Sequence, residues 1–498
     1  MTKLEEYKKK RDLINKYSYA NFVITFDEAT VCPKNDKEYS LEVSNYFYKE
    51  ILSIIKSDEY YNLLASLKND KSIDEITLKA INKEYEDITK ERLIPNDFSF
   101  ELMDIQSKTY LSWQKSTTSL NYDEFEKNLD ELVNKYKDYT KFKEGKLFGY
   151  DVLLDEMEDD FNTKIYDDFF NKLEKELMPL VKKILSLPKK YNENIKNVKF
   201  DIDKQRHLTK KICDLMGYTD EVGYVGETLH PFTNGINSND VRTTTKYDEK
   251  LLFSNIYSVM HEVGHATYEL QNNKDFSNTV LMGGTSTALH ESQSRFYENY
   301  LGRSKEFIEF LYPILKDLFK EELKDYTFDD IYYYINDVSN EPIRTEADEL
   351  TYPFHIIIRY KIEKMLFEGK LKASEINDKF NELMNEYLSY IPKNKKEGCF
   401  QDVHWSSDFG YFPTYALGSA ISAQLYFYMQ KDLDVKKLMS KGDFKPINEW
   451  LKEHIHKYGR TVKNLDLIKL ATGEDFNPDY YINYLKDKFK KIYNIWNK

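Results

Sequence analysis

Apolar residues recur every three or four positions along most of the 498-residue chain, and this periodicity constrains its fold more than any other feature. In YDEFEKNLDELVNKYKDYTKF, residues 122–142, the apolar side chains fall on one face of a helix and the charged ones on the other. Prolines mark the ends of such segments, as at Pro33, Pro95 and Pro188, where they remove no hydrogen bond from a helix interior. The pattern predicts a mainly α protein in which one helix follows another.

The periodicity is interrupted once, between about Val222 and Tyr247. This segment, VGYVGETLHPFTNGINSNDVRTTTKY, is rich in glycine, asparagine and β-branched residues. Such a composition predicts a small irregular sheet or hairpin beside the helices. Helical patterning resumes with LLFSNIYSVMHEVGHATYEL and continues to the end of the chain.

The histidines are unevenly distributed, because all nine lie at or beyond His207. Any site based on histidine must therefore be built by the C-terminal three-fifths of the chain. Neither an internal repeat nor a long flexible linker interrupts the sequence, so we predict a single domain over residues 1–498. Within it, we expect residues 1–200 to form a helical wall and residues 201–498 to carry the site.

Charge and composition exclude several classes of function. The chain has 72 lysine and arginine residues against 85 aspartate and glutamate residues, a net charge of −13 without a basic stripe, so we expect no nucleic-acid partner. No stretch approaches the roughly 18 apolar residues of a membrane span, and the N-terminal segment lacks a signal-peptide pattern. Three scattered cysteines, Cys32, Cys213 and Cys399, make no disulfide framework, so we expect ordinary thiols in a cytoplasmic protein without a membrane partner.

The segment HEVGH, residues 261–265, carries two histidines four positions apart with a glutamate directly after the first. On a helix, His261 and His265 direct two imidazole nitrogens at one point, while Glu262 stands about 100° round the helix beside them. This arrangement is typical of peptide hydrolases in which a bound metal lowers the pKa of a water molecule and the glutamate accepts its proton. The motif therefore predicts metal-assisted peptide hydrolysis, although the same spacing also arises by chance on amphipathic helices.

Neighbouring residues favour the metal site over chance. Val259, Val263 and Leu270 give the helix apolar positions with which it can be buried beside a dry cleft. Gly264 costs roughly 1 kcal/mol of helix propensity relative to alanine, but its lack of a side chain would let another segment approach the metal closely.

A catalytic zinc usually has three protein ligands, so a third ligand must come from elsewhere in the chain. Glu291, within ALHESQSRFYENY, follows His265 by 26 residues, which is enough for a turn and a returning helix. Without the upstream motif, Glu291 would be interpreted as a solvated carboxylate on a helix surface. His290 is a rival ligand, but adjacent helix positions point about 100° apart, so only one of the two readily faces the metal.

Seven motifs follow one another along the chain: HPF at residues 230–232, DVRTTT at 240–245, HEVGH at 261–265, HESQSR at 290–295, IRTEADE at 343–349, GCFQDVHW at 398–405 and GYFPTYALG at 410–418. In this order they resemble the motifs of the carboxypeptidase Taq group of metallocarboxypeptidases, also called thermostable carboxypeptidase 1. The resemblance covers about residues 220–425. The N-terminal half is similar mainly in being helical. Its segment FDEATVCP partly matches an aromatic-acidic segment typical of the family, but Phe26 stands where a tryptophan is expected.

The resemblance implies an almost wholly helical single domain folded around a deep substrate groove, with the small sheet near the active site. It also implies one divalent metal ion per chain, zinc or cobalt, usually a homodimer, and the removal of single residues from peptide C-termini. Carried over residue by residue, it makes His261, His265 and Glu291 the metal ligands and Glu262 the general base.

A carboxypeptidase must recognise a terminal carboxylate, and arginine suits this task because its guanidinium group binds both oxygens in parallel. Arg242 in DVRTTT and Arg344 in IRTEADE are the two motif arginines placed to close the end of the groove. The alternative for each is a structural salt bridge, with Asp240 or with Asp348. We expect at least one of the two arginines to bind the substrate.

His404 and Tyr411 are the candidates for stabilising the oxyanion. An imidazole and a phenol each donate a hydrogen bond to the substrate carbonyl oxygen as it gains negative charge. The alternatives are a core histidine and a packed tyrosine.

Two other functions stay open besides a metallocarboxypeptidase acting on peptides with a free C-terminus. A thimet-type oligopeptidase or endopeptidase would share HEVGH and a later glutamate, but it requires no carboxylate clamp. An inactive helical peptide-binding protein would not require Glu262 and three intact ligand candidates. The motif arginines favour the carboxypeptidase, whereas a ligand set of two histidines and one glutamate suits zinc and cobalt alike.

Overall fold

Helices dominate the computed structural model, which describes residues 1–228 and 230–495. The first of them are α1 (Lys3–Thr30), α2 (Lys37–Ile55), α3 (Asp58–Leu67), α4 (Glu75–Glu91), α5 (Asn96–Ser119), α6 (Asp123–Lys143), α7 (Tyr150–Met157), α8 (Thr163–Leu185) and α9 (Ile202–Met216). The others are α10 (Leu252–Leu270), α11 (Thr287–Arg295), α12 (Lys305–Leu318), α13 (Phe328–Ile335), α14 (Tyr352–Phe367), α15 (Ile376–Leu388), α16 (Phe412–Asp432), α17 (Val435–Met439), α18 (Lys445–His454), α19 (Asn464–Thr472) and α20 (Asp479–Tyr493). The mainly α architecture expected from the periodicity is confirmed.

Short helical segments of other types connect these helices. The 3-10 segments are η1 (Glu193–Asn197), η2 (Lys274–Phe276), η4 (Arg344–Glu346), η5 (Ala373–Glu375), η6 (Val403–Ser406) and η7 (His456–Tyr458). A π-helical segment, η3 (Phe296–Gly302), continues α11 without a break.

Several helix ends fall where the sequence predicts them. Pro95 is the N-cap residue of α5, Pro188 follows the end of α8, and Pro33 lies between α1 and α2. The first helix begins with a capping box, in which the Thr2 N–H donates to the Glu5 carboxylate (2.7 Å) and the Glu5 N–H donates to Thr2 Oγ1 (3.2 Å).

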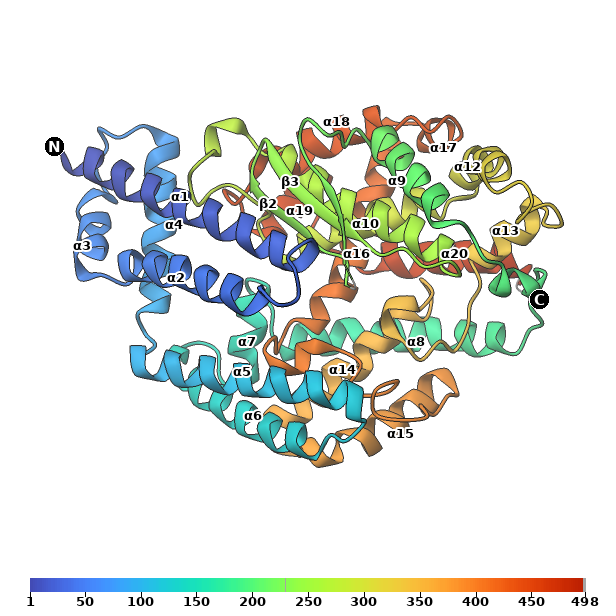
Figure 1. The fold of residues 1–498 in the computed structure, drawn as a ribbon, viewed down its shortest axis with the longest axis horizontal. Helices are drawn as coiled ribbons and strands as arrows, with labels where there is room; N and C mark the ends of the chain where they lie inside the picture. The colour runs from blue at the N-terminus through green and yellow to red at the C-terminus, as the bar shows by residue number, and fades with distance from the viewer. Residues whose placement is uncertain (229, 496–498) are drawn as a thin grey trace.

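The sheet predicted within residues 222–247 is present and has three short strands. They are β1 (Val225–Glu227), β2 (Thr233–Asn237) and β3 (Asp240–Thr245). Strand β3 lies in the centre, parallel to β1 and antiparallel to β2. Helix α10, which carries the HEVGH motif, packs against β2 and β3 (Figure 1). The sheet therefore lies beside the candidate metal site, as expected.

The buried side chains of the described residues form one large core, a smaller separate one and a three-residue cluster of Ala80, Phe276 and Leu281. The large core begins at Leu102 and includes the buried faces of α10, α11, α14 and α16. The smaller core is built by α1, α3 and α4, with Tyr60, Leu64 and Ile81 fully buried in it. Helix α1 also reaches the sheet, because the Phe26 ring packs edge-on against Phe232 with ring centroids 6.0 Å apart. The first helices thus form a flank beside the sheet rather than part of the main core.

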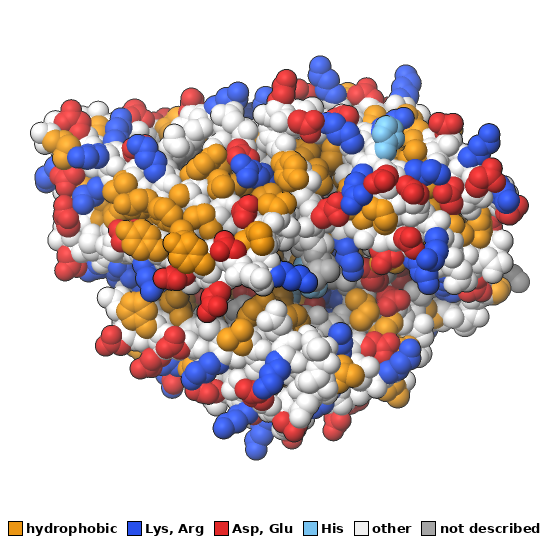
Figure 2. Space-filling view, in the orientation of Figure 1, with side chains coloured by type: hydrophobic (Ala, Val, Ile, Leu, Met, Phe, Trp, Pro, Cys, Tyr) orange, Lys and Arg blue, Asp and Glu red, His pale blue; other side chains and the backbone are white. Residues whose placement is uncertain are grey.

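The molecule has an upper and a lower part in the view of Figure 1. Helices α1 and α2, the sheet and α10 lie in the upper part, whereas α5, α6, α14 and α15 lie in the lower part. Figure 2 shows the surface hollowed near the centre, between these two parts. This arrangement agrees with the helical fold around a substrate groove that the sequence predicts.

The cysteines are ordinary thiols, as expected. Cys213 and Cys399 are buried, Cys32 is partly exposed, and all three are free thiols. Among the helices of residues 1–228 and 230–495, none combines the length and the low polarity that a bilayer-spanning segment requires.

Candidate active site

Helices α10 and α11 bring the three predicted ligand residues together. His261 Nε2 lies 3.7 Å and His265 Nε2 lies 3.5 Å from Glu291 Oε2. One donor atom from each of the three residues lies within 4.8 Å of the others. Among residues 1–228 and 230–495, this is the one group of three or more histidine, cysteine, aspartate or glutamate side chains that are close enough together to hold a metal ion.

Two glycines allow the glutamate-bearing helix to lie this close. A Cβ atom on Gly264 of α10 would stand 2.9 Å from the Ser294 Cα, and one on Gly418 of α16 would stand 2.8 Å from the Ala288 carbonyl oxygen. Side chains at either position would collide with the backbone of α11. The close approach expected at Gly264 is therefore present, and the approaching segment is the helix that carries Glu291.

The donor atoms fit a divalent metal ion. His261 Nδ1 lies 2.9 Å from Glu298 Oε2 and His265 Nδ1 lies 2.6 Å from His290 Nδ1, so both Nε2 atoms face Glu291. Ligand distances of about 2.0–2.1 Å in a tetrahedral site place two ligand atoms about 3.3 Å apart, close to the 3.5 and 3.7 Å found here. His290, the rival ligand, lies behind His265 and outside this set.

Glu262 is buried next to the ligand atoms. Thr233 of β2 donates a hydrogen bond from its hydroxyl to Glu262 Oε2 at 2.6 Å. Burial raises the pKa of the Glu262 carboxyl, although His261 and Thr233 act in the opposite direction. The sheet therefore contributes to the site by holding the side chain of the predicted base.

A further carboxylate, not predicted from the sequence, supports His261. Glu298 lies in the π-helical segment η3, seven residues after Glu291, and forms ion pairs with Arg295 (3.2 Å) and Arg303 (3.3 Å). Burial raises the pKa of Glu298, but Arg295 and His261 outweigh it and lower the pKa to about 2. A spacing of seven residues, two helical turns, is the sequence signal that could have identified it.

Arg344 is buried in an ion pair with Asp402 rather than with Asp348, the partner considered in the alternative to substrate binding. Its Nε and Nη2 each lie 2.8 Å from Asp402 Oδ1, and Nη1 donates to the Tyr352 hydroxyl at 3.1 Å. The salt bridge with Asp348 that was the alternative to substrate binding is not formed, because the Asp348 carboxylate instead accepts hydrogen bonds from the backbone and hydroxyl of Thr351. The sequence separation of Arg344 and Asp402 hides their contact from local pattern analysis.

A second arginine shares the same carboxylate. Arg359 of α14 is fully buried and lies 2.6 Å from Asp402 Oδ2. Two guanidinium groups and one carboxylate leave one positive charge uncompensated. We call Arg344, Arg359 and Asp402 the cationic cluster.

Arg242 has the salt bridge that was the alternative to substrate binding. Its Nε and Nη2 lie 3.0 and 2.9 Å from the Asp240 carboxylate. Its guanidinium group packs over the rings of Phe22 and Phe26 of α1, at 5.4 and 5.5 Å from their centroids. Arg242 thus joins the sheet to the N-terminal helices.

His404 and Tyr411 lie together beside the cationic cluster. Their ring centroids are 5.3 Å apart, and His404 Nε2 lies 3.1 Å from the hydroxyl of Tyr415. Burial and the nearby Arg344 lower the pKa of His404 to about 4, so its ring is neutral near neutral pH. Tyr415, which the sequence analysis missed, stands one helical turn after Tyr411 and beneath the Arg344 guanidinium at 4.7 Å.

Tyr352 connects the cationic cluster with the ligand residues. Its hydroxyl accepts the hydrogen bond from Arg344, and its ring lies 4.1 Å from the Arg295 guanidinium. Arg295 Nε in turn donates to Glu291 Oε1 at 2.7 Å. A continuous chain of contacts therefore runs from the candidate metal ligands to Arg344, and neither Tyr352 nor Arg295 was predicted.

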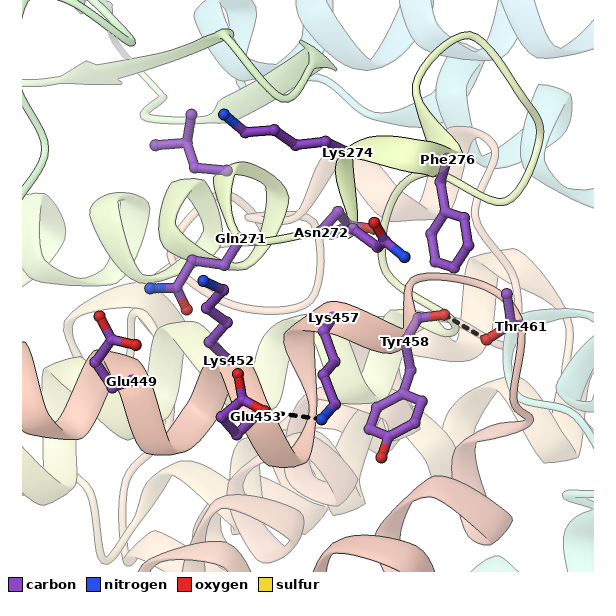
Figure 3. A pocket seen from close by; sticks show the side chains of 12 residues that line it. Gln271, Asn272, Lys274, Phe276, Glu449, Lys452, Glu453, Lys457, Tyr458 and Thr461 are labelled. Atoms are coloured by element: carbon purple, nitrogen blue, oxygen red, sulfur yellow. Dashed lines mark hydrogen bonds and ion pairs between the residues drawn. The ribbon is translucent and has the colours of Figure 1, made fainter. Parts of the chain in front are cut away.

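A separate surface pocket opens beside the C-terminal end of α10 (Figure 3). Lysine and glutamate side chains line it, including the Glu453–Lys457 ion pair at 2.8 Å. It contains none of the predicted site residues. The candidate active site is therefore the buried cluster between α10, α11 and the 398–418 segment.

Comparison with known proteins agrees with this geometry. The model of the family described as carboxypeptidase Taq (M32) metallopeptidase matches residues 6–489. Carboxypeptidase 1 of Bacillus subtilis is 37% identical over 486 residues, which are 96% of each chain. Thermostable carboxypeptidase 1 of Pyrococcus furiosus is 35% identical over 435 residues, covering 86% of this chain and 87% of that protein.

Solved structures show the same fold over nearly the whole chain. The Pyrococcus furiosus carboxypeptidase superposes with a TM-score of 0.93 at 32% identity, covering 98% of this chain and 99% of the other. The M32 carboxypeptidase of Deinococcus radiodurans gives a TM-score of 0.94 at 25% identity, covering 99% and 100%. A structure described as a putative oligoendopeptidase F, at 12% identity and a TM-score of 0.62, shares the fold alone.

Proposed function

The chain belongs to the carboxypeptidase Taq (M32) family of metallopeptidases and is a metallocarboxypeptidase, and on this premise we propose which residues hold its metal, bind the peptide and move the proton. The proposed ligands of one divalent ion per chain are His261, His265 and Glu291. Their converging donor atoms are the observation that carries the proposal. The donor set suits zinc and cobalt alike.

Glu262 is the proposed general base. A divalent ion at this site acts as a Lewis acid and lowers the pKa of water. Glu262 then accepts the proton of the attacking water and later delivers it to the leaving nitrogen of the scissile peptide bond. The hydrogen bond from Thr233 supports this role, because it holds one carboxylate oxygen and leaves the other free to take the proton.

Arg344 is the proposed receptor for the terminal carboxylate of the peptide. The cationic cluster has a surplus positive charge, and the Tyr352–Arg295 contacts connect it with Glu291. Arg242 is the weaker candidate, because Asp240 compensates its single charge, whereas Arg344 must share Asp402 with Arg359. A guanidinium–carboxylate pair of this kind gives both affinity and direction to binding.

His404 and Tyr411 are the proposed donors to the oxyanion. Burial keeps both groups in the form that donates a hydrogen bond without carrying charge, because it lowers the pKa of His404 and raises that of Tyr411. Neutral donors fixed in a buried site stabilise developing negative charge without reorganisation.

The proposed oligomeric state follows from the resemblance to the family, and the proposed location and partners follow from composition. We propose a homodimer that acts on peptides with a free C-terminus in the cytoplasm, without nucleic-acid or membrane partners. The net charge of −13 and the three free thiols support the location and the absence of a nucleic-acid partner. The organisation as a single domain, with residues 1–200 as a wall and residues 201–498 carrying the site, remains a prediction.

The direct test is an assay of one peptide in two forms, with a free and with an amidated C-terminus, before and after treatment with a chelator. We expect release of single C-terminal amino acids from the free acid, little cleavage of the amide, and loss of activity with chelator that added zinc or cobalt restores. Equal cleavage of both forms with release of internal fragments would instead indicate a thimet-type oligopeptidase. Activity that survives complete metal removal would contradict the ligand assignment.

A further inference from the structure

The two histidines of the candidate metal site have different hydrogen-bond partners at Nδ1. His261 Nδ1 contacts the Glu298 carboxylate directly. His265 Nδ1 instead contacts the ring of another histidine, at 2.6 Å from His290 Nδ1, and His290 Nε2 lies 2.7 Å from Glu269 Oε1. His265 and Glu269 stand one turn apart on α10, so the ring of His290 from α11 spans both of them.

The contacts run from Glu269 through His290 to His265, and the carboxylate of Glu269 fixes where the protons lie. An ionised carboxylate only accepts hydrogen bonds, so His290 Nε2 carries the proton shared with Glu269. The neutral His290 ring then presents an unprotonated Nδ1, which accepts the Nδ1–H of His265. His265 is thereby left with an unprotonated Nε2, the atom that faces Glu291.

The surrounding residues hold the His290 ring in place. A Cβ atom on Gly284 would stand 2.6 Å from His290 Cδ2, so the loop before α11 lies directly against the ring. The ring of Tyr268 packs on it as well, with centroids 5.1 Å apart. His290 therefore has little room to rotate away from His265.

We propose that His290, backed by Glu269, is a positioning residue that keeps His265 in the Nδ1-protonated tautomer and directs its Nε2 to the metal. The inference rests on the proposed role of His265 as a ligand. Partners of this kind orient ligand histidines in metal sites, and their loss typically lowers metal affinity about 10–100-fold. His290 touches neither substrate nor metal and acts through His265.

Two substitutions of His290 separate positioning from simple packing. Phenylalanine at position 290 fills the space but accepts no hydrogen bond, whereas asparagine places an amide oxygen near the position of Nδ1. We expect His290→Phe to weaken zinc binding about 10–100-fold, measured by competition with a chromophoric chelator, and His290→Asn to restore most of the affinity. In ¹⁵N spectra of zinc-free, histidine-labelled protein, His290→Phe should show His265 losing its single Nδ1-protonated tautomer, because zinc bound at Nε2 would itself hold the proton on Nδ1.

His456 offers a matched control. It is also buried against Tyr268, with ring centroids 4.8 Å apart, and its two nitrogens contact Gln271 and Gln293 at 2.7 and 2.8 Å. His456→Phe should destabilise the fold without a specific change in zinc affinity. Equal losses of zinc affinity in the His456 and His290 phenylalanine variants would overturn the proposal.

Two further variants keep the test decisive if His290→Phe does not fold. Glu269→Gln retains an oxygen that accepts the hydrogen bond from His290. Its loss of zinc affinity should therefore be smaller than that of His290→Phe, and less than tenfold relative to the unaltered protein. His265→Ala should lose the metal outright, and retained zinc there would refute the ligand assignment itself. Loss of zinc in His265→Ala together with unchanged zinc affinity and tautomer in the His290 variants would refute only the positioning role.

Discussion

Two buried polar clusters of opposite charge lie next to each other in the candidate active site. One surrounds His261 and His265 with the carboxylates of Glu262, Glu291 and Glu298, and we call it the acidic cluster. Arg295 and Arg303 offset only part of its negative charge. The other is the cationic cluster, in which Arg344 and Arg359 share Asp402.

His261 in the acidic cluster and His404 beside the cationic cluster titrate differently, although both are buried. Burial lowers the pKa of His261, but the carboxylates of Glu291 and Glu298 outweigh burial and raise it. At His404, beside the cationic cluster, burial and Arg344 together lower the pKa to about 4. The carboxylates that face His261 thus favour a cation there, whereas Arg344 adds to burial in disfavouring a proton on His404. At His265, burial prevails and lowers the pKa to about 4 even within the acidic cluster.

Tyr352 and Arg295 connect the clusters, and this connection relates the chemistry to the substrate. A peptide offers a carbonyl to be polarised and, one residue further on, a terminal carboxylate. Placing an acidic and a cationic cluster side by side matches those two groups in order. We therefore expect selection of the chain end to depend on the acidic and the cationic cluster together.

The largest expected effect comes from disabling the base in the acidic cluster while leaving its ligands intact. Glu262→Gln preserves size and the acceptor for Thr233 but accepts no proton from water. We expect kcat to fall about 10²–10⁴-fold with a full complement of metal. Steady-state kinetics together with elemental analysis measures both quantities. Near-normal turnover at stoichiometric metal would contradict the assignment of Glu262.

A smaller effect is expected from removing the proposed anion receptor in the cationic cluster. Arg344→Ala should lower kcat/KM for a free-acid peptide about thirtyfold or more, because a desolvated guanidinium–carboxylate pair is worth about 2–5 kcal/mol. The variant should fold, since Arg359 and Asp402 still neutralise each other. It should also discriminate little between free-acid and amidated peptides.

Arg242→Ala is the matched control for this arginine. Its guanidinium group binds Asp240 and α1, so the variant should keep the preference for the free acid. Measuring kcat/KM for both substrate forms with both variants gives a two-by-two comparison. If Arg242→Ala lost the preference for the free acid and Arg344→Ala kept it, Arg242 would be the residue that binds the terminal carboxylate.

The smallest expected effect concerns stability at acid pH. The pKa of His404 is about 4 in the folded protein against about 6.5 in an unfolded chain, so the unfolded chain binds more protons between these values. Stability due to this group is therefore fully present above pH 6.5 and is lost as the pH falls towards 4. In His404→Gln this loss, about 2–3 kcal/mol in the free energy of unfolding, should be absent.

Urea denaturation of both proteins between pH 4 and pH 8 measures the difference. Other buried histidines titrate in both proteins, so the difference between the two curves isolates His404. An offset between the curves that is independent of pH would show that the pKa of His404 is not depressed by burial and Arg344.

Local spacing in the sequence predicted the part of the site that local structure builds. The i, i+4 relation of His261 and His265 places both on one face of α10, and the distance to Glu291 allowed a returning helix. The interruption of periodicity correctly located the sheet. The structure brings these residues together, while their roles in binding and catalysis remain predictions.

The contacts that the sequence analysis missed join segments far apart in the chain. The structural salt bridge considered for Arg344 was with the nearby Asp348, but Asp348 accepts hydrogen bonds from Thr351 and the partner of Arg344 is Asp402. Tyr352 was missed because its role depends on two arginines brought together by separate elements. Periodicity determines which face of a helix is buried, whereas the packing of helices determines which polar groups meet there.

The close contacts of α11 with two glycines have a consequence for protein engineering. Replacing glycine by alanine inside a helix is a standard route to thermostability, with a gain of up to about 1 kcal/mol in helix propensity. At Gly264 and Gly418 the added methyl group would push against the backbone of α11 at less than 3 Å. Consensus or library designs for a more heat-resistant enzyme should therefore leave both positions unchanged. The added methyl group would displace the helix that carries Glu291, whatever the gain in helix propensity.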